Sequence, residues 1–242
     1  MNGTLKVALV TGANKGIGYE IAKQLGEKGI TVLIGARDAA RGQEAERSLK
    51  DQGIEARFVR LDVTDQPSID EAYHYIADKF GKLDILVNNA GIFLEEPLPS
   101  RNDVGTMQQV FDTNLFGVFR VTKAMLPLIR LSEQGRIVNA SSSLGSLTLM
   151  GDPNFELAPF LVLGYNTSKT AVNALTRFFA NELMDTPIKV NAADPGYCAT
   201  EMNGFTGYRA PQQGARAAVW LATLPADGPT GGFYNEEGPL PW

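Results

Sequence analysis

Short apolar runs alternate with longer helical stretches from one end of the chain to the other. The apolar runs are rich in β-branched residues and have the length of buried strands. They lie at residues 6–10, 31–36, 56–61, 85–87, 136–140, 188–192 and 232–234. The intervening helical stretches include residues 16–28, 40–52, 68–80 and 104–131. This rhythm predicts parallel strands joined by right-handed helical crossovers.

The pattern therefore predicts a doubly wound α/β fold, with helices on both faces of one mainly parallel, seven-stranded sheet. The length of 242 residues fits a single domain, and no internal repeat, low-complexity tract or linker divides the chain. In sheets of this kind, ligands bind beyond the carboxyl ends of the strands, where the strand order reverses. Candidate functional residues should accordingly follow predicted strands.

The composition narrows the class of protein. A formal net charge of −5 argues against general affinity for nucleic acid or for anionic membranes. No apolar run approaches the length of a membrane span, and residues 1–6 lack the features of a secretory signal. One cysteine, Cys198, and one histidine, His74, exclude an internal disulfide and the usual zinc sites. We expect a soluble, cytoplasmic protein with no metal.

A glycine-rich loop follows the first predicted strand. Residues 11–18 read Thr-Gly-Ala-Asn-Lys-Gly-Ile-Gly and lead into a predicted helix. Three glycines at such a turn let backbone N–H groups approach a pyrophosphate at the positive end of the helix. A glycine-rich turn without a ligand is the alternative, which the position after the first strand disfavours. The loop residues expected to bind a cofactor are Gly12, Asn14, Lys15, Gly16, Ile17 and Gly18.

The end of the second strand indicates which dinucleotide is bound. An NAD site typically places a carboxylate there to accept hydrogen bonds from the ribose 2′-hydroxyl. Ala36 stands at that position instead, and Arg37 follows it. Together with Lys15, this guanidinium would neutralise a 2′-phosphate, so NADPH/NADP is the expected cofactor. The alternative is that Arg37 merely pairs with Asp38 on the surface.

The loop resembles the T-G-x-x-x-G-x-G nucleotide loop of the short-chain dehydrogenase/reductase family. Other family motifs follow in order: Asn-Asn-Ala-Gly at 88–91, Tyr-x-x-x-Lys at 165–169 and Pro-Gly at 195–196. The resemblance covers residues 5 to about 200. It implies a Rossmann-type fold, with residues 1–242 forming a single dinucleotide-binding catalytic domain. The C-terminal segment resembles the carbonyl reductase branch.

The resemblance also implies cofactor contacts beyond the first loop. Asp62 would face the adenine amino group, and the small residues at 88–91 would let the backbone approach the ribose. Thr200 would hold the nicotinamide carboxamide. The complete set implied outside the first loop is Arg37, Asp62, Val63, Asn88, Ala90, Gly91, Tyr165, Lys169, Pro195, Gly196 and Thr200.

Tyr165 and Lys169 are the candidate acid–base pair. Their i, i+4 spacing places them on one face of a predicted helix. A phenol is a sluggish acid at neutral pH, and an adjacent ammonium would lower its pKa by stabilising the phenolate. Tyr165 would then protonate the alkoxide formed in a reduction, while Lys169 also holds the ribose hydroxyls. Taken alone, the spacing also fits two amphipathic surface residues.

Two further catalytic residues follow from the resemblance. Ser142 stands third after Asn139, as the family's catalytic serine does, and would hydrogen-bond the substrate carbonyl and the developing oxyanion. Ser141 and Ser143 are the alternatives if the register slips by one residue. Asn114 matches an asparagine that holds a water linking the lysine to solvent. Its alternative is a core asparagine that bends its helix.

The substrate side is less defined. The 22 residues between Ser142 and Tyr165 exceed the number in many relatives, and residues 144–164 are rich in apolar side chains. The segment would line an apolar pocket for a hydrophobic ketone or aldehyde, or else pack as a surface loop with a small core of its own. The expected pocket residues are Phe93, Ser142, Met150, Phe155, Tyr197 and Met202. The oligomeric state stays open, although an insertion before the helix that many relatives use for pairing favours a monomer.

The sequence thus predicts an NADPH-dependent carbonyl reductase that transfers hydride reversibly between nicotinamide and a ketone or aldehyde. The alternatives are an NAD-linked alcohol dehydrogenase and a nucleotide-sensing binding module of the same fold.

Overall fold

The computed structural model describes residues 5–160 and 162–242. The described ranges leave out residues 1–4, where no secretory signal is expected. They also leave out residue 161, which lies inside the expected insertion. The strands are β1 (Val7–Thr11), β2 (Thr31–Ala36), β3 (Ala56–Arg60), β4 (Ile85–Asn88), β5 (Arg136–Ala140), β6 (Lys189–Ala193), β7 (Phe233–Asn235) and β8 (Gly238–Pro239). The helices are α1 (Gly16–Gly26), α2 (Ala39–Asp51), α3 (Gln66–Phe80), α4 (Val104–Phe111), α5 (Val118–Ile129), α6 (Leu147–Met150), α7 (Leu163–Glu182) and α8 (Pro211–Ala222). A π-helical segment, η2 (Asp112–Gly117), joins α4 to α5, and single 3₁₀ turns are η1 (Pro99–Arg101), η3 (Ser143–Gly145) and η4 (Glu201–Asn203).

The strands form one sheet in the order β3-β2-β1-β4-β5-β6-β7-β8. The strand order reverses between β1 and β4, so the loops that follow these two strands open the crevice in which such sheets bind ligands. The predicted doubly wound fold is confirmed. The seven predicted parallel strands are β1 to β7, and the sheet also has an eighth strand, β8, which pairs antiparallel with β7. A two-residue strand of Gly238 and Pro239 offers no apolar alternation by which a sequence pattern could reveal it.

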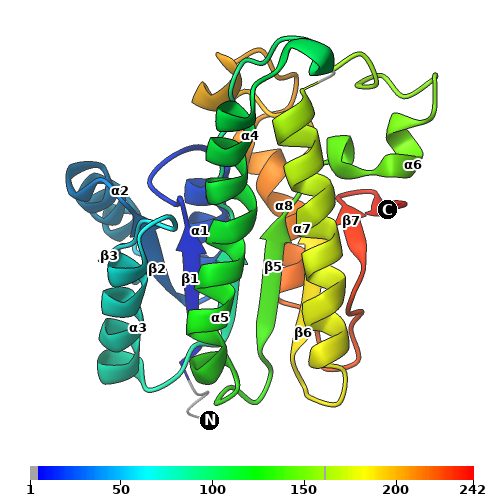
Figure 1. The fold of residues 1–242 in the computed structure, drawn as a ribbon. Helices are drawn as coiled ribbons and strands as arrows, with labels where there is room; N and C mark the ends of the chain where they lie inside the picture. Colours follow the sequence, from blue (N-terminus) through cyan, green and yellow to red (C-terminus); the bar gives the residue numbers. More distant parts are fainter. Residues whose placement is uncertain (1–4, 161) are drawn as a thin grey trace.

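Two hydrophobic cores lie on opposite faces of the sheet. Alternate residues of β1 point to different cores: Ala8 and Val10 pack with side chains of α1, α2 and α8. Val7 and Leu9 pack on the other face with side chains of α3, α5 and α7. Figure 1 shows α3, α5 and α7 as one layer in front of the sheet, with α1 and α8 behind it. Burial on both faces explains why the strands read as continuous apolar runs.

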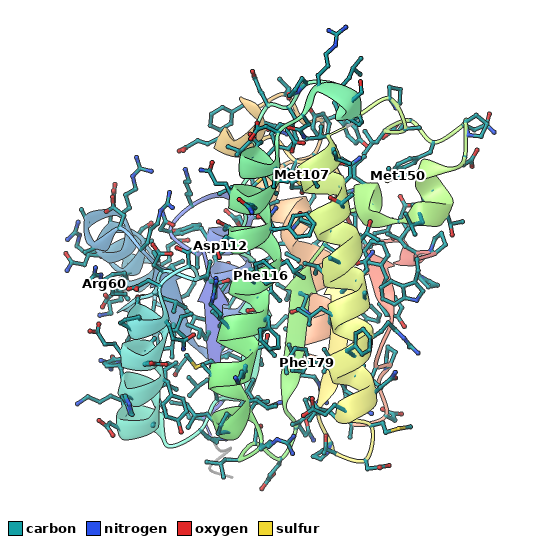
Figure 2. The ribbon with its side chains drawn as sticks, in the orientation of Figure 1. Arg60, Met107, Asp112, Phe116, Met150 and Phe179 are labelled. Carbon is teal, nitrogen blue, oxygen red and sulfur yellow. The ribbon has the colours of Figure 1, made fainter. Side chains whose placement is uncertain are left out.

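The stretch predicted as one helix over 104–131 is a helix with a change of pitch. It runs as α4, widens into η2 and continues as α5 to Ile129. Alpha4 and η2 pack along α7, as Figures 1 and 2 show. Short π-helical insertions are frequent at functional sites, and this one carries Asn114. None of the helices in the described ranges is long and apolar enough to cross a membrane.

Candidate active site

The loop between β1 and α1 adopts backbone conformations that require glycine. Gly12 and Gly16 have φ angles of 65° and 58°, in the left-handed region. A Cβ added to Gly18 would lie 2.4 Å from the carbonyl oxygen of Gly12, so only glycine permits this packing. Asn89, at the end of β4, donates from Nδ2 to the carbonyl oxygen of Thr11 at 2.9 Å and so fixes the loop to the neighbouring strand.

This loop borders an open cleft of about 620 Å³, within the size range of ligand sites. Most predicted cofactor residues line it, and they come from the ends of four strands and the start of η4. They are Gly12, Asn14, Lys15, Gly16, Ile17, Gly18, Arg37, Asp62, Val63, Ala90, Gly91 and Thr200. Asn88 does not line it: this side chain is buried and donates from Nδ2 to Thr122 Oγ1 and Asn139 Oδ1, each at 2.9 Å. Its neighbour Asn89 lines the cleft instead.

Cations gather where the 2′-phosphate is expected. Arg37 and Arg41 line the cleft from the region where β2 leads into α2, and Lys15 lines it from the glycine loop. Asp38 caps α2 by accepting from Arg41 N at 3.0 Å, so its carboxylate has a structural role in the helix. Lys15 forms an ion pair with Glu201 of η4 on the other side of the cleft.

Tyr165 and Lys169 lie one turn apart in the first half of α7. Lys169 is 5% exposed and donates from Nζ to the carbonyl oxygen of Ala140 at 2.8 Å, at the carboxyl end of β5. The same Nζ lies 5.6 Å from the ring centroid of Tyr165. Ser142 lies close enough to the phenol of Tyr165 to lower its pKa. The sheet edge thus brings Ser142, Tyr165 and Lys169 together.

The neighbouring serines take other positions. Ser141 is buried and donates from Oγ to Asn173 Oδ1 at 2.6 Å. Ser143 is also buried and lies beside the carboxylate of Asp194, whose pKa it lowers. Ser142 therefore differs from the two alternatives by its place beside the phenol.

The electrostatics of this cluster differ from the expectation. Burial and the negative charge of Asp194 raise the pKa of Tyr165 to about 12, against an opposing hydrogen bond from Ser142. Burial lowers the pKa of Lys169 to about 8, which Asp194 partly offsets. The lowered phenol pKa predicted from the spacing of Tyr165 and Lys169 is therefore wrong in direction for this structure. The sequence pattern shows the ammonium but neither the loss of water nor Asp194, which is 5% exposed at the end of β6.

Asn114 links three elements. Its Oδ1 accepts from Ile92 N at 2.8 Å, and its Nδ2 donates to Ile92 O at 3.0 Å and to Ser168 Oγ at 3.1 Å. Gly91 separates it from the lysine: a Cβ at Gly91 would lie 3.3 Å from Asn114 Oδ1 and 3.8 Å from Lys169 Nζ. The amide therefore ties η2 to α7 and to the loop after β4, beside the lysine.

The predicted pocket residues are dispersed. Phe93 packs edge-to-face on the ring of Tyr165, with centroids 5.4 Å apart. Tyr197 packs at 5.9 Å against Phe160 of the inserted segment. Met202 lines the nucleotide cleft.

Two predicted pocket residues come from the inserted segment itself. Met150, at the end of α6, contacts Asn166 of α7 through Sδ (Figure 2). Phe155 lies in an irregular stretch beyond α6 and is partly buried. Neither lines the nucleotide cleft.

A known protein family matches this chain across the motifs described above. The model of the short chain dehydrogenase family matches residues 6–209, which include the glycine loop, the strand ends and α7. The chain belongs to the short chain dehydrogenase family. The predicted family is confirmed, and with it the class of the protein as an oxidoreductase.

Curated members of the short chain dehydrogenase family are similar along nearly their whole length. Salutaridine reductase of Papaver bracteatum is 34% identical over 96% of this chain and 94% of its own. Carbonyl reductase 1 (NADPH) of Rattus norvegicus is 33% identical over the full length of both chains. That alignment spans 280 positions against 242 residues here, so the rat protein has segments that this chain lacks.

Solved structures of family members agree with the fold. Salutaridine reductase from Papaver somniferum superposes with a TM-score of 0.82 at 34% identity, over 95% of this chain and 99% of that chain. The NADPH-bound carbonyl reductase from chicken fatty liver gives a TM-score of 0.86 at 26% identity, over 99% of this chain and 100% of that chain.

The structure adds site residues of this short chain dehydrogenase that sequence reasoning missed. Arg41 could have been found, because it is a second arginine four residues after Arg37, near the predicted start of a helix. Asp194 also follows a predicted strand, next to the Pro-Gly motif. Glu96 had no signal: it lies in an irregular loop, and its partners are 68 and 69 residues further along the chain.

Proposed function

We propose that this short chain dehydrogenase is an NADPH-dependent carbonyl reductase in which Tyr165 is the general acid and base. The observation that carries the proposal is the cluster of Ser142, Tyr165 and Lys169 at the edge of the sheet that opens the nucleotide cleft. It supplies a proton donor and a cation one turn apart on α7, and a partner for the substrate oxygen just after β5.

The cofactor is NADP(H). The residues present fit it: Lys15, Arg37 and Arg41 border the cleft, and Ala36 replaces the carboxylate that a 2′-hydroxyl would need. The closely packed glycine loop at the start of α1 offers its N–H groups to a pyrophosphate. Two relatives, the rat carbonyl reductase and the chicken enzyme, carry NADPH in their names. When bound, NADPH supplies the hydride for the reduction.

Ser142 and Tyr165 handle the substrate oxygen. As hydride arrives at the carbonyl carbon, the oxygen gains negative charge, and the Ser142 hydroxyl stabilises that charge by hydrogen bonding. Tyr165 then donates its phenolic proton to the oxygen, and the alcohol forms. A phenol pKa near 12 keeps this proton in place at neutral pH, which is the state that reduction requires.

Lys169 and Asn114 support the proton donor. The Lys169 ammonium favours the phenolate that remains after proton transfer, and its place beside the cleft suits the hydroxyls of the nicotinamide ribose. Asn114 and the same ammonium both lie beside Gly91, and Asn114 would hold the water that returns a proton. Pro195, Gly196 and Thr200 would hold the carboxamide end of the cofactor.

The substrate is a hydrophobic ketone or aldehyde. Phe93 contacts the ring of Tyr165, and the rings of Phe160, Tyr197 and Tyr208 pack in a separate series. The series joins the inserted segment 144–164 to the loop after β6, so both segments would border the substrate. Aromatic walls of this kind favour apolar, ring-containing substrates.

The test is a substrate panel with purified protein. Oxidation of NADPH would be followed with aryl and cyclic ketones, matched against small polar ketones, and repeated with NADH. We expect turnover of the apolar ketones with NADPH preferred. If the protein binds NADPH tightly but reduces none of the ketones, it is a nucleotide-sensing module. A preference for NAD with alcohols as substrates would indicate an alcohol dehydrogenase.

A further inference from the structure

The helix that carries Tyr165 begins without a cap of its own. Val162 occupies the N-cap position of α7, and an apolar side chain accepts no hydrogen bond. The first N–H groups of any helix lack partners within the helix, and polar side chains usually satisfy them. Alpha2, α3 and α4 follow this rule with aspartates at their N-caps. The helix that carries Tyr165 lacks such a side-chain cap, as α1 does.

Glu96 supplies the missing acceptor from another part of the chain. Its Oε2 accepts from Gly164 N at 2.7 Å, and its Oε1 accepts from Tyr165 N at 3.3 Å. Asn102 donates from Nδ2 to the same carboxylate and so holds it from the other side. A carboxylate at the positive end of a helix binds these N–H groups more strongly than a neutral acceptor does.

Gly164 makes this close approach possible. A Cβ at Gly164 would lie 2.7 Å from Glu96 Oε1, so any side chain there would displace the carboxylate. Glycine is otherwise a poor residue for a helix, whereas alanine is the best. The requirement at residue 164 is therefore for space beside Glu96, not for an unusual backbone angle.

The loop that carries Glu96 also holds the tyrosine ring. Phe93 packs edge-to-face on Tyr165, and the backbone of Ile92 bonds the amide of Asn114. The same loop starts at Gly91, which lines the nucleotide cleft. One loop thus contacts Tyr165 at its backbone N–H and at its ring, while its other end borders the nucleotide cleft.

We propose that Glu96 is a positioning residue for the reaction: its carboxylate fixes the start of α7 and so sets the Tyr165 phenol against Ser142. The inference rests on Tyr165 being the proton donor proposed above. Glu96 touches the backbone of residues 164 and 165, so it acts through Tyr165.

The first test compares Glu96→Ala with Glu95→Ala in the full chain. Glu95 is the exposed neighbour in the same loop and carries the same charge. Glu96→Ala should lower kcat roughly 10- to 100-fold, the range expected for a misplaced catalytic group. KM and the Kd for NADPH should change less than about twofold, because no substrate or cofactor contact is removed. Glu95→Ala should leave all three unchanged.

A double-mutant cycle then tests the contact itself. Gly164→Ala should lower kcat as Glu96→Ala does, since the new methyl group displaces the carboxylate. In the Glu96→Ala background, Gly164→Ala should cause no further loss. Additive losses would overturn the proposed contact.

A Tyr165→Phe background separates positioning from general stability. In that background Glu96→Ala should leave the residual rate unchanged, because no phenol remains to be positioned. If Glu96→Ala lowers the residual rate by the same factor as it lowers the wild-type rate, its role is structural alone, and the inference is overturned. Should Glu96→Ala fail to fold, Glu96→Gln keeps one acceptor oxygen and serves in the same comparisons. Full activity of Tyr165→Phe would refute the proposed function, whereas an inactive Tyr165→Phe beside a fully active Glu96→Ala would refute this inference alone.

Discussion

The two sides of the cleft present their charged and polar groups in opposite ways. On the nucleotide side, Arg37 and Arg41 are exposed, and the Lys15 side chain is 47% exposed. On the catalytic side, Lys169 and Asp194 are each 5% exposed. The first side presents its charges to solvent, and the second holds its charges among protein atoms.

This contrast decides how each side responds to change. Exposed charges interact weakly, are screened by salt and contribute almost independently of one another. Buried charges interact strongly, so a substitution at one of them changes the pKa values of its charged neighbours. Variants on the catalytic side should therefore change turnover and its pH dependence, and variants on the nucleotide side should change affinity and its salt dependence.

The largest effect among the supporting residues is expected at Lys169. Lys169→Ala removes the ammonium beside the phenol and should lower turnover about 100- to 1,000-fold, with weaker NADPH binding as well. Steady-state kinetics and a fluorescence titration with NADPH would measure both. Lys123→Ala, an exposed lysine on α5, is the control. Equal small losses in the two variants would contradict a special role for the buried lysine.

Arg37 should control the choice of cofactor. Arg37→Ala should weaken NADPH binding roughly 10- to 100-fold, as loss of a charged hydrogen bond does, and leave NADH binding nearly unchanged. Arg47→Ala, an exposed arginine on α2 that does not line the cleft, is the matched control. Added salt should reduce the difference between NADPH and NADH. If Arg37→Ala and Arg47→Ala bind NADPH alike, the assignment of the phosphate site fails.

Asp194 should set the alkaline limit of the reduction. The pKa of Lys169 is about 8, so the rate should fall as pH rises through that value and the ammonium is lost. Asp194 raises the pKa of Lys169, and therefore Asp194→Asn should move this fall to lower pH. Rates measured across the pH range, with the exposed Asp185→Asn as control, would show the shift. A shift to higher pH would contradict the electrostatic account.

The same variant gives a stability test with a defined sign. Burial raises the pKa of Asp194 in the folded state, so folding favours the protonated acid. Protonated Asp194 contributes to stability at pH values below the pKa that this carboxyl has in the unfolded chain. The contribution is lost as the pH rises through the pKa that the carboxyl has in the folded protein. At neutral pH the buried carboxylate of Asp194 therefore destabilises the folded protein. Asp194→Asn removes this destabilisation, while the new amide oxygen can still accept from Gly196 N. The variant should therefore have a higher Tm than the wild type at neutral pH and no advantage in acid.

The smallest effect is expected at Glu201. This carboxylate pairs with Lys15 across the cleft, and both side chains are about half exposed. Glu201→Gln should free Lys15 for the phosphate and tighten NADPH binding about two- to threefold, an effect that high salt removes. Binding of NADH should not change. Weaker NADPH binding in Glu201→Gln would mean that the carboxylate assists the cofactor.

The contrast between the two sides also explains what the sequence could predict. The glycine loop, Arg37 and the Tyr165–Lys169 spacing are local patterns, because each depends on residues within one turn or one helix. The alternating apolar runs predicted the doubly wound sheet, since burial on both faces leaves a plain signature in each strand.

The remaining features depend on contacts between distant segments. Glu96 reaches α7 across 68 residues, and the raised pKa of Tyr165 comes from burial and from Asp194 of another strand. No spacing rule carries such information. The widening of the helix at Asn114 and the two-residue β8 are likewise set by packing and pairing, not by apolar period.

Hydride transfer measured in Tyr165→Phe shows most directly whether the Tyr165 phenol donates the proton. A single turnover, followed by the loss of NADPH absorbance with an apolar ketone, isolates the chemical step from product release. We expect a rate about 100- to 10,000-fold below that of the wild type, with an NADPH affinity within about twofold of the wild-type value. A Tyr165→Phe enzyme that reduces the ketone at the wild-type rate would show that the proton comes from another group.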